Sequence, residues 1–195
     1  MYKMLTIKDK IRVPPIKFSL GLKDAIKSSL EDKWEGSIDK GSGVALSVAD
    51  IKNIEEGKIL AGDGAIHYPV EFHLLSYEPE MHEIVKGFVI DVTEFGVFVR
   101  IGPLDGMIHV SQLMDDFVSY DPKKSVFVGR DTKNVLKEGD IVKARIISVS
   151  TSGKEYKIGL TTRQQGLGGI GWKDRKTVRE EKTKKMKGVE KKIKD

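Results

Sequence analysis

The stretch that decides the fold covers residues 87–113 and reads GFVIDVTEFGVFVRIGPLDGMIHVSQL. Apolar residues occupy every second position in its central part, which is the period of a β-strand with one buried face. Val97, Val99 and Ile101 are therefore expected to point into a core, while Phe98 points outward. The stretch predicts a twisted strand with an aromatic ring on its outer side.

Similar strand patterns continue on both sides of this stretch. Five short strands are predicted, at residues 84–92, 95–101, 106–110, 141–149 and 155–161. Five short strands over about 80 residues are typical of a small all-β barrel of the OB type. A polar insertion at 114–138 separates the third strand from the fourth, and we expect it to form a hairpin or an ordered loop.

The first 78 residues follow a different pattern. Apolar residues at even spacing predict a first strand that ends at Pro14-Pro15, and an i+4 apolar stripe predicts a helix over 19–34. A later strand at 66–74 alternates strictly, although it contains Pro69, which we expect at a sheet edge or a bulge. One helix across an antiparallel sheet gives an α+β N-terminal domain.

Two further strands and a turn lie between the helix and residue 66. Val44, Leu46 and Val48 alternate as a strand, and residues 58–60 form a short one. A turn with the sequence Gly62-Asp63-Gly64 closes the short strand, and its glycines permit positive φ angles. By itself this turn fits an ordinary hairpin.

Composition and charge limit the possible classes of protein. The chain has 195 residues, 39% of them hydrophobic, and no cysteine, which excludes disulfides, thiolate metal sites and thiol nucleophiles. It has no apolar run as long as a signal peptide or a membrane span, so we expect a cytoplasmic protein with no membrane partner. Residues 171–195 hold 11 Lys and Arg against 5 Asp and Glu, and the net charge of +5 therefore reflects this end.

These shifts in pattern predict three parts. We expect an N-terminal α+β domain at 1–80, a barrel at 81–165 and a basic tail at 166–195, with the first boundary at Glu78-Pro79-Glu80. The tail could contact nucleic-acid phosphates or remain solvated.

Several motifs suggest chemistry that their context does not support. Gly166, Gly168 and Gly171 match the dinucleotide fingerprint G-x-G-x-x-G, but a Lys-rich segment follows instead of an apolar helix. The pair Asp115-Asp116 is expected to be a solvated turn, because adjacent side chains on a strand point to opposite faces. The histidines lack metal-ligand spacing, so we expect no metal, no cofactor and no catalytic residue.

Three spaced motifs at 87–111 resemble the S1-motif RNA-binding domain, with its pattern G-x-V, then F-G-x-F-V, then G-x-x-H-x-S. The resemblance implies that Phe95, Phe98 and His109 line an RNA-binding face, and that Lys154 or Lys157 adds a basic contact. Stacking of a base on an exposed aromatic ring contributes about 1–3 kcal/mol. The alternative is that the two phenylalanines only cap the barrel.

Over residues 1–172 the chain resembles the archaeal RNA polymerase stalk subunits of the E-prime family, related to the seventh subunit of eukaryotic RNA polymerase II. The features in order are the Pro-Pro strand end, the helix, the Gly-Asp-Gly turn, the insertion and the segment Thr161-Thr162-Arg163-Gln164 before Trp172. The resemblance implies a non-catalytic subunit that forms a stalk heterodimer with the F polypeptide of the polymerase and docks on the core subunits. Its tip would be Gly62, Asp63 and Gly64, and its barrel would bind single-stranded nascent RNA.

A second class of function is a free-standing S1-motif RNA-binding factor that acts in translation or RNA decay. The barrel alone fits both classes. Residues 1–78 discriminate between them, since they resemble the stalk domain and not a second RNA-binding repeat.

Overall fold

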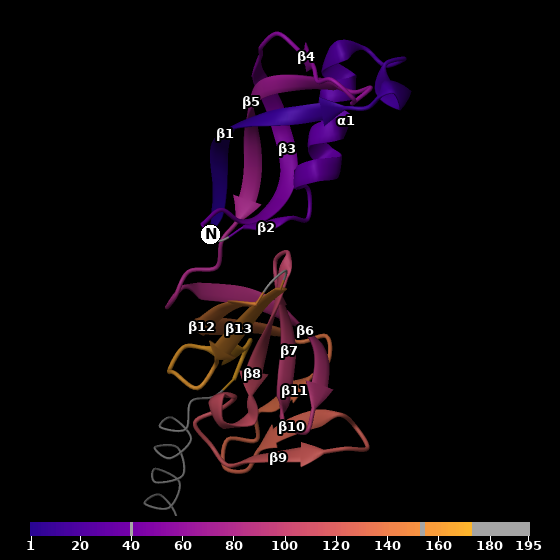
Figure 1. The fold of residues 1–195 in the computed structure, drawn as a ribbon. Helices are drawn as coiled ribbons and strands as arrows, with labels where there is room; N and C mark the ends of the chain where they lie inside the picture. The colour runs from indigo at the N-terminus through magenta and orange to yellow at the C-terminus, as the bar shows by residue number, and fades with distance from the viewer. Residues whose placement is uncertain (40, 153–154, 173–195) are drawn as a thin grey trace, which may run out of the picture. The chain divides into compact units, whose positions relative to one another are not determined.

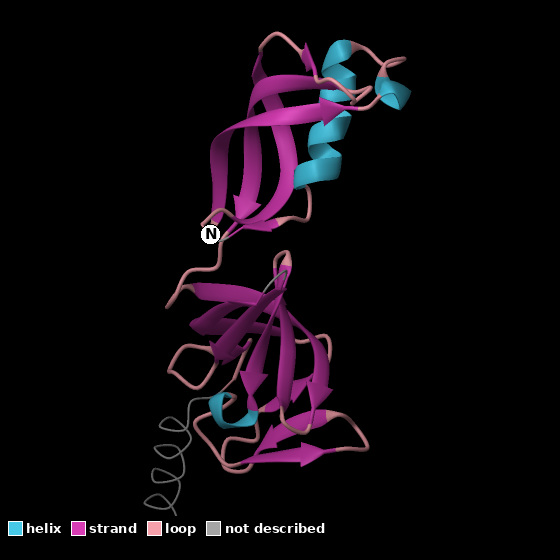
Figure 2. Ribbon diagram, viewed as in Figure 1, coloured by secondary structure: helices cyan, strands magenta, loops and turns pink. Residues whose placement is uncertain are grey.

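The structure is a computed structural model that describes residues 1–39, 41–152 and 155–172. The chain forms two compact units, of which the first covers Met1–Pro79 and the second begins at Glu80 (Figure 1). Figure 2 shows that the first unit combines helix and strands, whereas the second is built almost wholly of strands.

The first unit is an antiparallel sheet whose strands lie in the order β1-β5-β3-β2, with β4 paired to β5. Its three long strands are β1 (Tyr2–Val13), β3 (Gly43–Ile54) and β5 (Ile66–Tyr77). The short strands are β2 (Ile38–Asp39) and β4 (Lys58–Ile59). The single helix of the predicted α+β class is also present, and the fold class is confirmed.

The helix α1 (Leu22–Trp34) covers one face of this sheet (Figure 1). Ile26 and Leu30 are fully buried in one cluster with Phe72. The helix begins three residues later than predicted, with Gly21 as its N-cap, and a short 3-10 helix at Pro15–Lys17 precedes it. Proline favours such a first turn, since it has no backbone N–H to leave unpaired.

Strand β3 departs from the predicted alternation. Its register against β5 shifts three times, between Ala45 and Ser47, Val48 and Asp50, and Ile51 and Asn53. Each β-bulge adds one residue and moves the inward position along by one. Ala45, Val48 and Ile51 therefore contact the core at a spacing of three, and the expectation that Val44, Leu46 and Val48 share one face is wrong.

The position of Pro69 also differs from the expectation. Strand β5 is central, paired with β1 on one side and with β3 and β4 on the other. The Pro69 carbonyl accepts a hydrogen bond from the Glu55 backbone N at 3.0 Å, just beyond the last β3 pair at Ile54. A residue in an antiparallel strand directs its N–H and C=O to the same side. The missing backbone N–H of Pro69 would therefore point between the end of β3 and the start of β4. No strand pair at this position requires a hydrogen bond from it.

The second unit is a barrel with the strand order β13-β8-β7-β6-β12, and pairing of β13 with β12 closes it. The strands are β6 (Ile84–Thr93), β7 (Gly96–Ile101), β8 (Leu104–His109), β12 (Ile141–Ser152) and β13 (Glu155–Thr161). The five predicted strands are present, and β13 runs parallel to β8. Val97, Val99 and Ile101 are buried in the barrel core, as predicted.

The insertion between β8 and β12 is more ordered than a single hairpin. It forms a three-stranded antiparallel sheet of β9 (Val118–Asp121), β10 (Val126–Gly129) and β11 (Val135–Lys137). Phe127 and Leu136 are fully buried and belong to the same cluster as the barrel core. The insertion therefore extends the barrel core.

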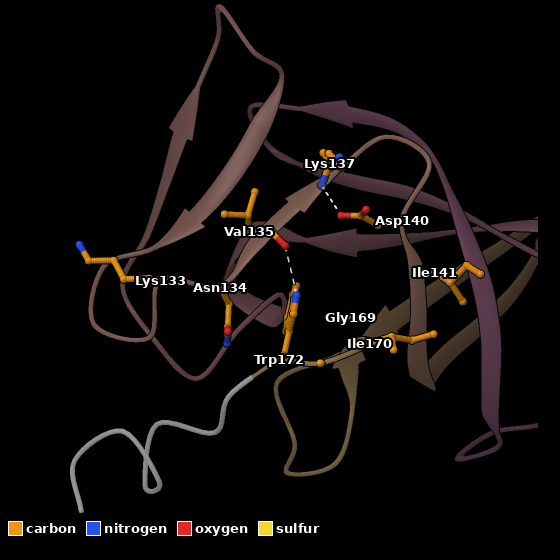
Figure 3. A pocket seen from close by; sticks show the side chains of 10 residues that line it. Lys133, Asn134, Val135, Lys137, Asp140, Ile141, Gly169, Ile170 and Trp172 are labelled. Atoms are coloured by element: carbon orange, nitrogen blue, oxygen red, sulfur yellow. Dashed lines mark hydrogen bonds between the residues drawn. The ribbon is translucent and has the colours of Figure 1, made fainter. Parts of the chain in front are cut away.

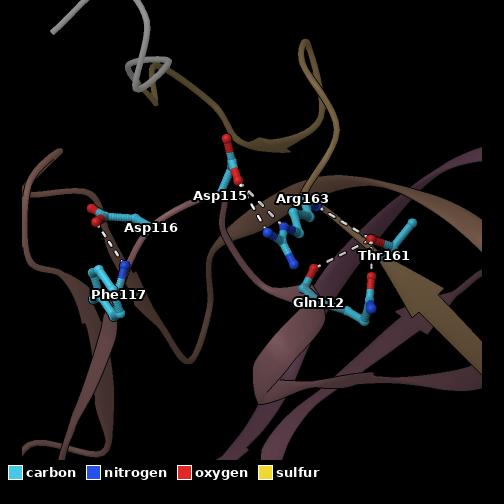
Figure 4. A network of polar contacts seen from close by, with 6 residues as sticks. All are labelled: Gln112, Asp115, Asp116, Phe117, Thr161 and Arg163. Carbon is cyan, nitrogen blue, oxygen red and sulfur yellow. Dashed lines mark hydrogen bonds and ion pairs between the residues drawn. The ribbon is translucent and has the colours of Figure 1, made fainter. Parts of the chain in front are cut away.

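The two adjacent aspartates of the insertion have different environments (Figure 4). One carboxylate oxygen of Asp116 accepts hydrogen bonds from the backbone N of Asp131 at 3.0 Å and from the backbone N and hydroxyl of Thr132, both at 2.9 Å. Burial alone would raise the pKa of Asp116. The hydrogen bonds, from Thr132 first, outweigh this effect, so the pKa of Asp116 lies below its usual value. Asp115 instead pairs with Arg163 at 3.3 Å. The predicted solvated turn is thus wrong for Asp116.

We predict that Asp116→Ala lowers the free energy of unfolding by about 1–2 kcal/mol, because four hydrogen bonds to a charged acceptor are lost, the three above and one from the Phe117 backbone N. Asp115→Ala is the matched control and should cost under about 1 kcal/mol, as for an exposed ion pair. Urea denaturation of the two variants measures the difference. Equal losses would contradict a special role for Asp116.

Candidate nucleic-acid interface

Two phenylalanine rings stand on the outer side of the barrel at the start of β7. Phe95 lies in the turn before β7 and is 48% exposed, and Phe98 is half-buried on the strand. Their ring centroids are 6.3 Å apart at an interplanar angle of 87°, an edge-to-face contact. This contact fixes the two rings relative to each other and leaves part of each exposed.

The glycine between these rings brings β7 close to β8. Gly96 pairs with His109, and a Cβ atom on Gly96 would lie 2.3 Å from the Ile108 carbonyl oxygen. The backbone N of Val110 also donates to the Phe95 carbonyl at 3.0 Å. Glycine is therefore required for the close approach that places Phe95 beside the end of β8.

His109 ends β8 and caps the short 3-10 helix that follows, Val110–Gln112. Its Nδ1 atom accepts a hydrogen bond from the Ser111 backbone N at 3.3 Å and lies 2.9 Å from the Ser111 hydroxyl. Because Nδ1 acts as an acceptor, the neutral ring carries its proton on Nε2. The side chain is exposed and can present that N–H to a ligand.

An open groove of about 750 Å³ runs beside these residues. Phe98, Met107, His109, Tyr156 and Lys157 contribute to its lining. Its lining residues come from β7, β8, β13 and the last part of β12. The groove therefore forms only when the barrel closes. Apolar walls, with a cation and a hydrogen-bond donor at the edge, suit an unpaired base and its phosphate.

The structure brings together most of the predicted RNA-binding residues. Phe98, His109 and Lys157 line one groove, and Phe95 touches Phe98 at its edge. Lys154 lies outside the described residues. Met107 and Tyr156 were not predicted as site residues. Met107 lies opposite Phe98 in the antiparallel pair of β7 and β8. The alternation of side chains along β8 could therefore have identified Met107 as an outward-facing residue.

The Gly62-Asp63-Gly64 turn is held to the sheet by its aspartate. Arg12 Nε and Nη2 donate to the two Asp63 oxygens at 2.9 and 2.8 Å, and His67 Nε2 lies 3.0 Å from Asp63. These hydrogen bonds, from Arg12 first and then from His67, hold the Asp63 pKa well below its usual range. Asp63 therefore orders the turn from within.

The two glycines of the turn differ. Gly62 has φ +86° and needs glycine for its backbone conformation, whereas Gly64 does not have a positive φ. Exposed apolar side chains lie on the segments that flank the turn, with Ile16 at 85% and Ile59 at 73% exposure. A Cβ on Gly64 would lie 3.8 Å from Pro15, so these two segments are neighbours. This apolar group was not predicted from the sequence.

The glycines of the fingerprint near the end of the barrel have structural roles. Gly168 and Gly169 form β14, which pairs with β12, and a Cβ on either would lie within 2.4 Å of the Trp172 ring. Trp172 Nε1 donates to the Val135 carbonyl at 3.1 Å, beside a pocket of about 480 Å³ (Figure 3). Gly168 and Gly169 leave room for the indole against β14, while Gly166 and Gly171 have φ angles of +80° and +84° in the turns on either side. None of these roles needs a nucleotide.

Within the described part of the chain, no three His, Asp or Glu side chains are gathered as metal ligands. None of its helices is both long enough and apolar enough to cross a membrane.

Comparison with known proteins matches both units. Residues 8–64 match the SHS2 domain found in the N terminus of Rpb7p/Rpc25p/MJ0397, and residues 78–160 match the S1 RNA binding domain. The DNA-directed RNA polymerase subunit Rpo7 of Saccharolobus shibatae is 38% identical over 174 residues, which are 88% of this chain and 97% of that protein. The chain belongs to the Rpo7 family. The predicted resemblance to the archaeal polymerase stalk subunit with an S1 domain is confirmed.

Other relatives define the extent of this match. Rpo7 of Sulfolobus acidocaldarius is 38% identical over 88% of this chain and 94% of its own length. Ribonuclease R of Buchnera aphidicola is 35% identical, but over 40% of this chain and 11% of that protein. Membership of the Rpo7 family makes the chain a subunit of a DNA-directed RNA polymerase.

Proposed function

We propose that this Rpo7 family member is a non-catalytic stalk subunit that pairs with the F polypeptide as its stalk partner, docks on the polymerase core through its first unit, and binds emerging single-stranded RNA on its barrel. The observation that best supports RNA binding is the groove beside Phe98, His109 and Lys157. As part of an archaeal polymerase, the chain would act in the cytoplasm. We expect it to need no cofactor.

The chemistry of the groove favours RNA without strong sequence preference. Every base has a flat π-face, so stacking on Phe95 and Phe98 does not select one base. Lys157 is exposed at the groove and supplies a positive charge for a phosphate. His109 Nε2–H can donate to a phosphate, a ribose hydroxyl or a base edge.

The tip turn supports docking on another protein chain. Gly62 and Gly64 present backbone with no side chain, and exposed Ile16, Ile59 and Leu60 lie on the neighbouring segments of the chain. Apolar side chains gathered at one place on a surface are typical of protein interfaces. The hydrogen bonds of Asp63 to Arg12 keep the turn in one conformation before docking, which lowers the ordering cost.

Gly64→Leu tests this docking role. The change should leave the free chain folded, because a Cβ at this position makes only an ordinary contact. In the complex the added side chain would separate the tip from the core, and a clash of about 1–3 kcal/mol weakens docking roughly 5–150-fold. The measurement is titration of the chain, assembled with its stalk partner, into core polymerase from the same source.

Lys27→Leu, on the exposed side of α1, is the control and should dock normally. Loss of the stalk heterodimer in the Gly64 variant would point to a folding defect. Undiminished docking by a folded Gly64→Leu heterodimer would place the core contact elsewhere.

The free-standing RNA-binding factor is the less favoured reading. It would rest on the second unit, which carries the S1 RNA binding domain, and the Ribonuclease R relative matches 40% of this chain. The Rpo7 relatives cover both units. A tagged pull-down from nuclease-treated native extract separates the two readings, since recovery of the large polymerase subunits supports the stalk and recovery of ribosomal proteins opposes it.

A further inference from the structure

Strand β12 continues beyond the groove with a line of outward-facing residues. Ile147 lines the groove, and the residues two and four positions before it are Arg145 and Lys143. The alternate residues Ala144 and Ile146 are fully buried in the barrel core. Arg145 and Lys143 therefore stand on the outer side of the strand, at steps of about 6.6 Å leading away from the groove.

The neighbouring strand β6 adds to the same surface. Lys86 lies directly opposite Lys143 in the antiparallel pair, and Phe88 lies opposite Ile141. Lys86, Phe88 and Lys143 are all exposed, and Phe88 has 49% of its surface accessible. The surface thus has two lysines side by side with an aromatic ring next to them.

This pairing of like charges needs an explanation. Two lysines directly opposite in a sheet destabilise it, and neither forms an ion pair with any described residue. Arg145 Nε is enclosed and has no hydrogen-bond partner in the described part of the chain. Three cations thus stand together without an acidic partner among the described residues, which fits a surface that receives a polyanion.

The surface also connects with the phenylalanine pair through β7. Phe88 lies opposite Arg100, and Arg100 is two residues from Phe98 on the same outer side. Asp105 pairs with Arg100 at 2.9 Å and neutralises it. The excess positive charge therefore belongs to Lys86, Lys143 and Arg145, and it lies next to the exposed ring of Phe88 on β6, whose partner Arg100 leads along β7 to Phe98.

We propose that single-stranded RNA leaving the groove continues across β12 and β6, where Lys86, Lys143 and Arg145 bind its phosphates and Phe88 stacks on a base. The interleaving of cations with an aromatic ring distinguishes this surface from a patch for an apolar partner. The inference rests on the proposed RNA binding in the groove. It adds a second segment to the path and predicts that affinity grows with RNA length.

The test compares two lengths of oligouridine on the full chain bound to its stalk partner. An RNA of about 5 nucleotides fits the groove alone, while one of about 15 reaches the second segment, within the range of site sizes of OB folds. The variant is Lys86→Gln with Lys143→Gln. The control is Lys123→Gln with Lys124→Gln, an equal change of charge on exposed lysines of the insertion.

The variant should bind the long RNA about 10–30-fold more weakly at 0.1 M salt, and its slope of log affinity against log salt should be smaller by about 1.4, as for two lost phosphate contacts. Short RNA should bind unchanged. Phe88→Ala should weaken only the long RNA, by about tenfold. The control variant should keep both the affinity and the slope.

Two results would overturn the inference. Unchanged binding of long RNA by the Lys86 and Lys143 variant rejects it, and if that variant instead fails to bind the stalk partner or core polymerase, the surface is a protein interface. A different result would reject the proposed RNA binding in the groove: short RNA that binds unchanged after Phe95 and Phe98 are replaced.

Discussion

Replacing Phe95 and Phe98 together by alanine should weaken binding of a short oligouridine by at least about 30-fold. Each ring can stack one base, at about 1–3 kcal/mol per base, so the pair contributes about 2 kcal/mol or more. The rings also support each other through their edge-to-face contact, so each single variant should already lose part of the other ring's effect. The measurement is a fluorescence anisotropy titration at fixed salt.

The fold should survive this double change, because Phe95 is exposed, Phe98 is half-buried and neither belongs to the barrel core cluster. Phe117→Ala is the matched control. This ring is more exposed than either of the pair and lies outside the groove. Circular dichroism checks that each variant is folded. Full RNA affinity in the folded double variant would leave the rings with only a capping role.

Gly96→Ala should destabilise the barrel strongly, by about 3 kcal/mol. The added Cβ would lie 2.3 Å from the Ile108 carbonyl oxygen, and this backbone atom cannot turn away as a flexible side chain could. Strands β7 and β8 would have to separate to make room for it. The same shift would move Phe95 away from the end of β8, so RNA affinity should fall together with stability.

Gly139→Ala separates this collision from the general cost of replacing glycine. Gly139 has φ +87° and open space around its Cβ position. Alanine there should cost only about 1–2 kcal/mol of backbone strain and leave RNA binding unchanged. Urea denaturation, with a titration in parallel, compares the two variants. A Gly96→Ala protein as stable as Gly139→Ala would mean that the strands can separate at little cost.

The barrel could be predicted well from the sequence because its strands keep a period of two. Val97, Val99 and Ile101 alternate with half-buried Phe98 and exposed Arg100, and the structure buries all three. Strand β3 has bulges, which change the spacing of its core residues from two to three, so its period of two was misleading. The position of Pro69 in a central strand could not be predicted either, because it depends on where β3 and β4 pair with β5.

The residues of the candidate site that lie close together in the sequence could be predicted. Those that distant strands bring to the groove could not. Phe95, Phe98 and His109 fall within 15 consecutive residues of one motif. Tyr156 reaches the same groove from β13, which lies beside β8 only because the barrel closes. Asp63 was predicted as a docking residue, and its hydrogen bonds to Arg12 and His67 are a feature that sequence spacing does not reveal.

The parallel pairing of β8 with β13 has a consequence for how the chain folds as it is synthesised. Gly106 pairs with Ile158, so a nascent chain must extend some 50 residues beyond β8 before this contact can form. Contacts between segments so far apart form slowly, because a long loop must close first. Until then β8 presents an unpaired edge, which is prone to aggregation. The groove beside Phe98 and His109 can therefore be completed only after β13 has been synthesised.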